Sequence, residues 1–155
     1  MLKKRFISVT DSLQFSTIVE IGKVFGKNYK TARRCTFDIN DNDIFWCPQL
    51  AKIEDGVWRS ASNSGWINWL SEDWNEIFEE IPNEKSKNSE PKRNNRVVFA
   101  KSRDSLGNNT YRFIGTYCFD RQIENNSINV YKRIACQYDI SIPVRKEGSI
   151  TNFPA

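Results

Sequence analysis

The stretch from Arg96 to Ile140 constrains the fold of this chain most, because it contains three short β-strand patterns joined by polar turns. The patterns cover residues 97–101, 111–117 and 130–135. In the middle pattern aromatic residues recur at every second position, with Gly115 among them, and the set on one face is Tyr111, Phe113, Tyr117 and Phe119. A period of two is typical of a strand with one buried face, so this stretch predicts a β-rich core.

The remaining sequence predicts an α+β protein in which residues 1–155 form a single domain, since this length can bury a substantial core. We expect a bent mixed β-sheet or a small β-barrel with one or two helices. Further short strands are predicted at residues 4–9, 33–39 and 44–47. One helix is predicted from Ser12, as its N-cap, to about Gly26, a natural stop. Residues 82–95 lack any side chain able to anchor a core, which predicts a mobile polar loop.

The segment from Trp66 to Ile81 allows two structures. Its apolar residues fit helical spacing, which favours a helix. They also fit two strands joined by a turn at residues 71–75, as the surrounding β-patterns suggest. Both alternatives stay open from the sequence.

Several classes of chemistry are excluded by composition. The chain has no histidine, which rules out Ser-His-Asp and Cys-His catalysis and histidine metal sites. Its four cysteines lack the paired spacing of a zinc site, so we expect free, mostly buried thiols, and no metal or other cofactor. No apolar run approaches the roughly 20 residues of a membrane-spanning helix, and no signal peptide is evident. We therefore expect a cytoplasmic protein without a membrane partner.

Charge is distributed unevenly along the chain. Residues 1–40 hold eight Lys/Arg and three Asp/Glu, a net charge of +5, and residues 82–155 hold thirteen and seven, a net charge of +6. Residues 41–81 hold two and nine, a net charge of −7. Basic residues beside aromatic strands supply cations for phosphates and planar faces for bases. The predicted phosphate contacts are Arg33, Arg34, Lys101, Arg103 and Lys132.

All five tryptophans lie in the acidic middle segment. Most such rings fill a core, but Trp46, Trp58 or Trp66 could instead stack on an extruded or modified base. The polar run between Trp58 and Trp66 is the most site-like loop, with Arg59 as a charged partner for a phosphate or base edge. We therefore predict a pocket formed by Trp58, Arg59 and Trp66.

Carboxylates at residues 73, 76, 79 and 80 raise the question of acid–base or metal chemistry. A solvated acidic face explains them as well, and the chain has no nuclease motif. No catalytic residue is assigned, and binding is a better explanation of the pattern than enzymatic activity.

The strand sequences VVFAKS, YRFIGTYCFD and VYKRIA resemble the closing hairpins of PUA-like barrel modules, the group that includes the SRA and EVE domains. The resemblance covers about Arg96 to Cys136. It implies a compact barrel with a base-binding pocket and one or two supporting helices. Related modules accompany HNH-type restriction nucleases in bacteria, where they read modified DNA.

Together these patterns favour a non-enzymatic module of bacterial or phage origin that binds DNA or RNA, with a modified or extruded base as its target. The alternative is a small inhibitor or adaptor in a phage or defence conflict system. In that case a protein partner would contact the acidic, tryptophan-rich segment.

Overall fold

The computed structural model describes residues 6–32, 34–54, 57–59, 65–82 and 90–140, and for 52–54 and 57–59 it describes the backbone only. Half of the polar loop predicted at 82–95, residues 83–89, lies outside these residues. At the ends of that loop, Pro82 is buried, and Arg93 donates from Nη1 to the Phe119 carbonyl oxygen at 3.2 Å.

Twelve strands and one α-helix make up the described chain, with a short 3₁₀ helix, η1, near the N-terminus. The strands before residue 65 are β1 (Phe6–Ser8), β2 (Gln14–Phe15), β3 (Thr36–Asp38), β4 (Asp43–Trp46), β5 (Lys52–Glu54) and β6 (Val57–Arg59). The later strands are β7 (Ile67–Leu70), β8 (Glu76–Glu80), β9 (Asn95–Arg103), β10 (Asn109–Ile123), β11 (Ile128–Ala135) and β12 (Gln137–Asp139). The helices are η1 (Val9–Asp11) and α1 (Ile18–Val24).

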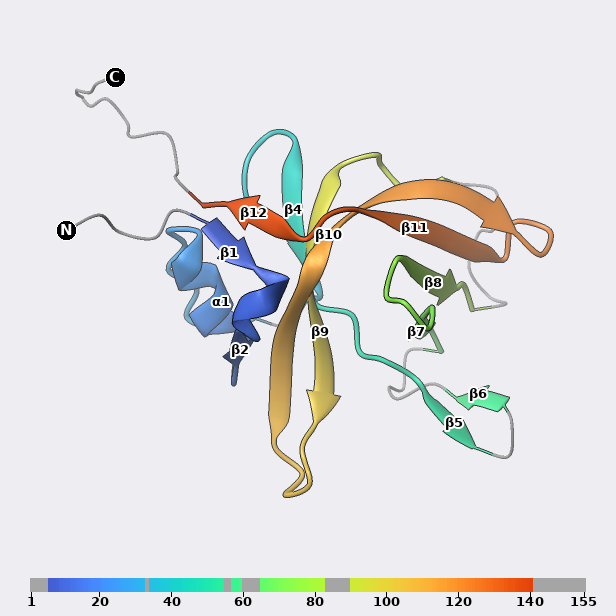
Figure 1. Cartoon of the computed structure of the whole chain (residues 1–155), viewed down its shortest axis with the longest axis horizontal. Helices are drawn as coiled ribbons and strands as arrows, with labels where there is room; N and C mark the ends of the chain where they lie inside the picture. Colours follow the sequence, from blue (N-terminus) through green and yellow to red (C-terminus); the bar gives the residue numbers. More distant parts are fainter. Residues whose placement is uncertain (1–5, 33, 55–56, 60–64, 83–89, 141–155) are drawn as a thin grey trace.

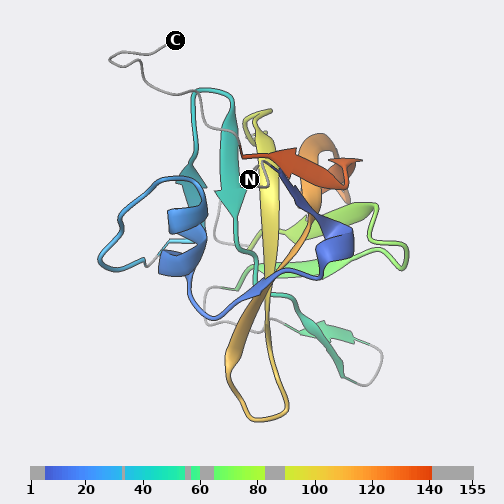
Figure 2. The same cartoon turned by 60° about the vertical axis from the view of Figure 1, so that its left-hand side comes forward.

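The main sheet has the strand order β3-β4-β9-β10-β11-β8-β7 and is mixed, because β4 and β9 run parallel whereas the other neighbours are antiparallel. The long strands β9 and β10 twist through the centre, and their hairpin projects beyond the body in both views (Figures 1 and 2). Isolated bridges join Gln49 to Lys101 and Leu50 to Asn68. Residues 49–50 thus connect β9 with β7, so the sheet bends back toward its own far end.

Strand β10 contributes side chains to two hydrophobic cores, because the alternation of its side chains between the two faces of the sheet breaks at a bulge between Phe113 and Gly115. Phe113 faces a core beneath α1, in which Phe45 stacks on Phe25 at a ring-centroid distance of 5.4 Å. Ile114 faces a second core inside the bent part of the sheet. Residues 113–117 are consequently buried on both faces, and the half-buried strand predicted from the alternation is wrong for this stretch.

The N-terminal helix begins later than the sequence predicted. Ser12 has a φ of +51° and ends η1 instead of capping α1. Phe15 is extended and pairs with Tyr111 of β10, so it packs from a strand. The N-cap is Thr17, whose hydroxyl accepts from the Glu20 N–H at 3.2 Å. Because this capping box places the N-cap at Thr17, α1 begins after β2, which ends at Phe15.

The ambiguous segment 66–81 forms the β7–β8 hairpin. Trp69 of β7 stacks on Phe78 of β8 with ring centroids 5.4 Å apart. Trp74 in the turn has a φ of +65°, a conformation that no helix interior tolerates. Pairing of β8 with β11 as well as β7 places the hairpin within the main sheet, which outweighs its helical periodicity.

The expectation of an α+β chain with a bent mixed sheet and one helix is confirmed. All four cysteines are free, but Cys35 and Cys136 are exposed and only Cys47 is buried, so the expectation of mostly buried thiols is wrong. Within the described ranges, no helix has the length and apolar character required to cross a bilayer.

Candidate functional site

An apolar concavity with convergent polar groups lies where the segment after β4 passes between β9 and β7. We call this hollow, with a volume of about 690 Å³, the aromatic pocket. Its lining residues come from α1, β3, β4, β7, β8, β9 and β10. Others come from the segments that precede β3, follow β4 and precede β7. Its aromatic lining consists of Trp46, Trp66 and Tyr111, and its polar lining includes Arg34, Asn68, Glu79 and Lys101.

Asn68 places an unsatisfied hydrogen-bond acceptor in the wall of the aromatic pocket. The residue is only 9% exposed, and its Oδ1 atom is buried with no hydrogen-bond partner among the described residues. A buried amide oxygen without a donor costs about 1–3 kcal/mol. A leucine of similar shape would avoid this cost, and a buried polar atom without a protein partner is the kind of atom that a bound water, ion or ligand satisfies.

Glu79 of β8 lies directly opposite Asn68 in the β7–β8 pairing and lines the same pocket. One of its carboxylate oxygens, Oε1, accepts from Tyr131 Oη at 2.7 Å and from Asn129 Nδ2 at 3.0 Å. These bonds fix the orientation of the carboxylate. Burial, followed by the nearby charge of Glu79, raises the pKa of Tyr131, which therefore stays a hydrogen-bond donor at neutral pH.

The remaining wall of the aromatic pocket is largely apolar. Trp46 is 2% exposed and belongs to the second core, so only part of its surface lines the hollow. Burial raises the pKa of the Cys47 thiol, and the neighbouring Cys35 adds to the shift. A neutral thiol is a weak nucleophile, so Cys47 contributes an apolar surface here. Lys101 lies at one side, with its Nζ 6.0 Å from the Tyr111 ring centroid.

A second hollow adjoins the aromatic pocket along β3 and shares Arg34 and Thr36 with it. We call this hollow, with a volume of about 250 Å³, the cationic groove. Its complete lining is Arg34, Thr36, Phe37, Asp38, Ile44, Lys92, Asn94 and Arg96. Three cations thus face one carboxylate, which gives the groove a net charge of +2.

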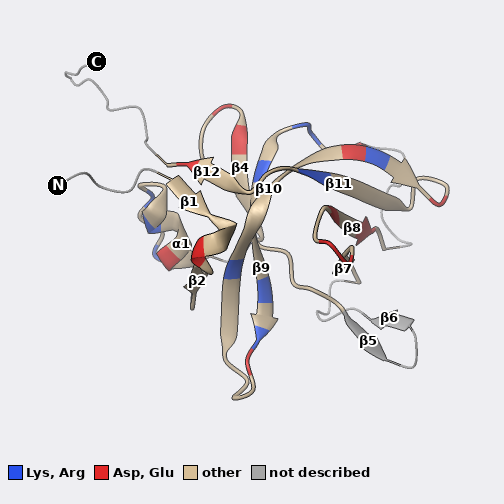
Figure 3. Ribbon diagram, viewed as in Figure 1, with Lys and Arg blue, Asp and Glu red and all other residues tan. Residues whose placement is uncertain are grey.

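Basic residues also follow the projecting β9–β10 hairpin, whereas the β7–β8 hairpin is acidic (Figure 3). Lys101 and Arg103 lie on β9 and Arg112 on β10. Leu106 in the connecting turn is 84% exposed. Cations along a projecting hairpin are typical of surfaces that contact a phosphate backbone.

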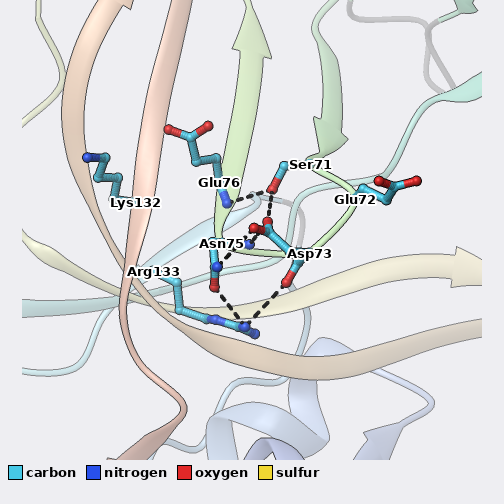
Figure 4. A pocket seen from close by; sticks show the side chains of 7 residues that line it. All are labelled: Ser71, Glu72, Asp73, Asn75, Glu76, Lys132 and Arg133. Atoms are coloured by element: carbon cyan, nitrogen blue, oxygen red, sulfur yellow. Dashed lines mark hydrogen bonds between the residues drawn. The ribbon is translucent and has the colours of Figure 1, made fainter.

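A third hollow surrounds the β7–β8 turn, and we call it the turn hollow (Figure 4). Asp73 accepts from the Ser71 hydroxyl at 2.8 Å and from the Asn75 N–H at 2.9 Å. Arg133 donates to the Asn75 side-chain oxygen at 3.0 Å and to the Ile114 carbonyl oxygen at 3.1 Å. Four of its polar side chains, those of Ser71, Asp73, Asn75 and Arg133, are thus bonded to one another or to the backbone.

The structure brings together some of the predicted site residues and separates others. Arg34, Trp66 and Lys101 meet in the aromatic pocket. Arg103 lies further along β9 and is exposed, and Lys132 lies in the turn hollow opposite Glu76. Arg33 and the side chains of Trp58 and Arg59 lie outside what the structure describes, and those three assignments stay predictions.

Asn68 was not predicted as a site residue, and Glu79 was predicted only as part of an acidic face. A signal for both existed. If 66–81 is taken as two strands, Asn68 falls on the face of Trp66 and Leu70, and Glu79 falls on the face of Ile77. A polar residue within an inward, apolar series is the pattern of a buried site.

Three comparisons with known proteins bear on this arrangement. No curated protein matches the chain. The solved structure described as "The 5-Hydroxymethylcytosine-Specific Restriction Enzyme AbaSI" matches with a TM-score of 0.66 and 26% sequence identity. The match covers 86% of this chain and 42% of that enzyme, so the chain spans less than half of its length.

The family model for the SRA domain, "SET and RING associated domain", matches residues 1–140. The match confirms the PUA-like resemblance inferred from residues 96–136 and extends it to the N-terminal strands and helix. Because this model matches nearly the whole chain, and the fold agrees with it, this chain belongs to the SRA domain family.

Proposed function

We propose that this chain is a DNA-binding module that holds an extruded, modified cytosine in the aromatic pocket. The observation that carries the proposal is the buried, unpartnered Oδ1 of Asn68 beside the oriented carboxylate of Glu79. SRA domains bind modified bases in DNA, which supports this reading of the pocket.

The polar groups of the pocket suit the edge of a cytosine. The exocyclic amine of cytosine is a donor that Glu or Asp accepts, and Glu79 has a second oxygen, Oε2, for which the described residues supply no hydrogen-bond partner. Asn68, the cross-strand neighbour of Glu79, has an amide oxygen that accepts and an amide nitrogen that donates. Enzymes and readers that extrude a base recognise it by such edge contacts together with aromatic stacking.

Stacking and backbone contacts complete the proposed site. Trp66 provides a partly buried ring at the pocket wall, and a base stacked on an aromatic side chain is stabilised by about 1–3 kcal/mol. Lys101 at the pocket and Arg103 on the projecting hairpin would position the phosphate backbone. The similarity to a restriction enzyme for 5-hydroxymethylcytosine supports a modified pyrimidine as the target and a role in bacterial or phage defence.

Fluorescence anisotropy on matched duplexes tests the proposal. The duplexes would carry cytosine, 5-methylcytosine or 5-hydroxymethylcytosine at one position in low-salt buffer. We expect one modified duplex to bind about tenfold more tightly than the unmodified duplex, the usual effect of one well-formed base contact. Trp66→Ala should reduce that preference.

Trp69→Phe is the matched control, because Trp69 lies on the same hairpin but stacks on Phe78 outside the pocket lining. It should keep the wild-type preference. Equal binding of all duplexes would refute modified-base recognition. The same preference in Trp66→Ala as in wild type would refute the assignment of the pocket. The protein-partner alternative stays a prediction.

A further inference from the structure

The cationic groove contains a buried cation without a counter-ion. Arg96 is 9% exposed, and its guanidinium carbon lies 4.6 Å from the Tyr131 ring centroid and 5.0 Å from that of Trp46. Its Nε has no hydrogen-bond partner. Among the described residues, no carboxylate forms an ion pair with it.

Two aromatic faces compensate only part of the cost of this burial. The guanidinium lies against two neighbouring aromatic rings and gains cation–π attraction from each, but this attraction is smaller than the cost of burying an unpaired charge. Paired charges and satisfied donors are the rule for buried arginines. Arg96, one of the residues that line the groove, therefore has an Nε–H donor without a protein partner, and an anion is the natural acceptor for it.

The outer part of the groove adds further positive charge. Arg34 lies over the Phe37 ring, with its guanidinium carbon 5.6 Å from the centroid, and no acidic side chain pairs with it in the described chain. Lys92 is exposed at the opposite wall, and Asp38 is the one carboxylate in the lining. Hydroxyl and amide groups of Thr36 and Asn94 supply neutral hydrogen bonds.

The shared wall relates the groove to the aromatic pocket. Arg34 and Thr36 line both hollows, so the groove and the pocket are adjacent at these two residues. A nucleotide carries its base and its phosphate on the same sugar. One extruded nucleotide therefore has the chemical composition to occupy both hollows.

We propose that the cationic groove binds a phosphodiester that flanks the extruded base, with Arg96 as its buried anchor and Arg34 and Lys92 as outer donors. The proposal rests on the proposed function of the aromatic pocket. It adds that the nucleotide is held at both ends, by its base and by its phosphate. The groove would then contribute affinity and position, whereas the pocket selects the base.

Neutral phosphate analogues provide the test. A duplex with the preferred modified cytosine is compared with two otherwise identical duplexes, each with one methylphosphonate at the 5′ or the 3′ side of that base. We expect one analogue to weaken binding by wild type about tenfold, as the loss of one charge-assisted contact would. Arg34→Gln should bind the natural duplex about tenfold more weakly and be insensitive to that analogue.

Lys23→Gln is the matched control, because Lys23 is an exposed cation of α1 that lines neither hollow. It should respond to the analogue as wild type does. If neither analogue affects wild type while the preference for the modified base persists, the groove proposal fails and the pocket assignment stands. Independent losses from Arg34→Gln and from the analogue would also overturn it.

An inorganic phosphate titration tests the groove independently of the proposed function. It also distinguishes binding of a free phosphate from binding of a phosphate in the DNA backbone. Binding would be followed by the Nε–H resonance of Arg96, which has no protein partner. A shift with phosphate in wild type that is reduced in Arg34→Gln supports an anion site even if no duplex shows a base preference. The absence of both a shift and an analogue effect overturns the proposal.

Discussion

The aromatic pocket and the turn hollow lie on the same β7–β8 hairpin, but they differ in whether their polar groups have hydrogen-bond partners within the protein. In the turn hollow, Asp73 and Asn75 hydrogen-bond to each other, and Arg133 binds the turn (Figure 4). In the aromatic pocket, Asn68 has a buried oxygen with no partner. The polar groups that form the turn are thus bonded within the protein, whereas the aromatic pocket contains an acceptor without a partner among the described residues.

This difference separates structural polar groups from groups that await a ligand. The turn hollow carries both signs of charge and several side chains of the kinds that form active sites. The bonds of Ser71, Asp73, Asn75 and Arg133 nevertheless have a structural explanation, because they hold a turn with Trp74 at positive φ. Asn68 has no comparable structural role. Substitutions in the two hollows should therefore separate stability from binding.

Glu79→Gln should have the largest effect on binding. The amide keeps an oxygen that accepts from Tyr131 and Asn129, but it presents a donor to the base where the carboxylate presents an acceptor. We expect the affinity for the preferred modified duplex to fall about 10- to 100-fold, as for a lost charged hydrogen bond. Anisotropy titration measures it. An unchanged affinity would show that Glu79 does not face the ligand.

Gly115→Ala should have the largest effect on stability. Gly115 has a φ of +132°, and an added Cβ would lie 2.5 Å from Cδ of Arg133, which crosses the strand there to reach the turn. We expect a loss of about 2 kcal/mol in the free energy of unfolding, measured by urea denaturation. Folded protein should keep the preference for the modified base. Wild-type stability would indicate that Arg133 moves aside freely.

Lys101→Gln and Lys132→Gln compare one cation at the aromatic pocket with one at the turn hollow. Lys101→Gln should reduce the slope of log affinity against log salt by about one, the loss of one phosphate contact. Lys132→Gln should leave the slope unchanged, because Lys132 lies opposite Glu76 in the β8–β11 register, in a hollow that Glu72, Asp73 and Glu76 also line. Titrations over a range of salt concentrations give both slopes. If Lys132→Gln reduced the slope and Lys101→Gln did not, the DNA-binding surface would lie at the turn hollow.

Asp73→Ala should have the smallest effect. Hydrogen bonds from the Asn75 N–H and the Ser71 hydroxyl lower the pKa of Asp73 in the folded state below its ordinary value of 3.8. A lowered pKa stabilises the fold above that value, and the stabilisation is lost as the pH falls through the folded-state pKa. The variant should melt slightly below wild type at pH 7, with the difference shrinking in acid, and should bind DNA normally. A binding defect would contradict a purely structural turn.

The parts of the fold that depend on local pattern were predictable from the sequence. The three strands at 97–135 and the helix end near Gly26 follow from alternation and from a glycine at positive φ. The helix start was misplaced because Phe15 pairs with β10, a long-range contact that local spacing does not reveal. The bulge before Gly115, which divides β10 between two cores, was not predicted for the same reason, because it too depends on long-range strand pairing.

The candidate site was predictable only in part. Trp66 and Lys101 were identified as aromatic and basic residues of suitable kind, and the structure brings both to the aromatic pocket. Asn68 was missed because the helical alternative for 66–81 obscured its inward position in a strand. Lys132 was assigned to phosphates from its neighbours in sequence, whereas its cross-strand neighbour is Glu76.

Asn68→Leu tests the central claim most directly, because it removes the unpartnered oxygen while it keeps the side chain's approximate shape. The measurement is the ratio of dissociation constants for the unmodified and the preferred modified duplex. Replacing an unsatisfied buried group by an apolar one is close to neutral for folding, so the variant should fold as wild type does. If Asn68 contacts the extruded base, the ratio falls to near one. A wild-type ratio in the folded variant would contradict the account.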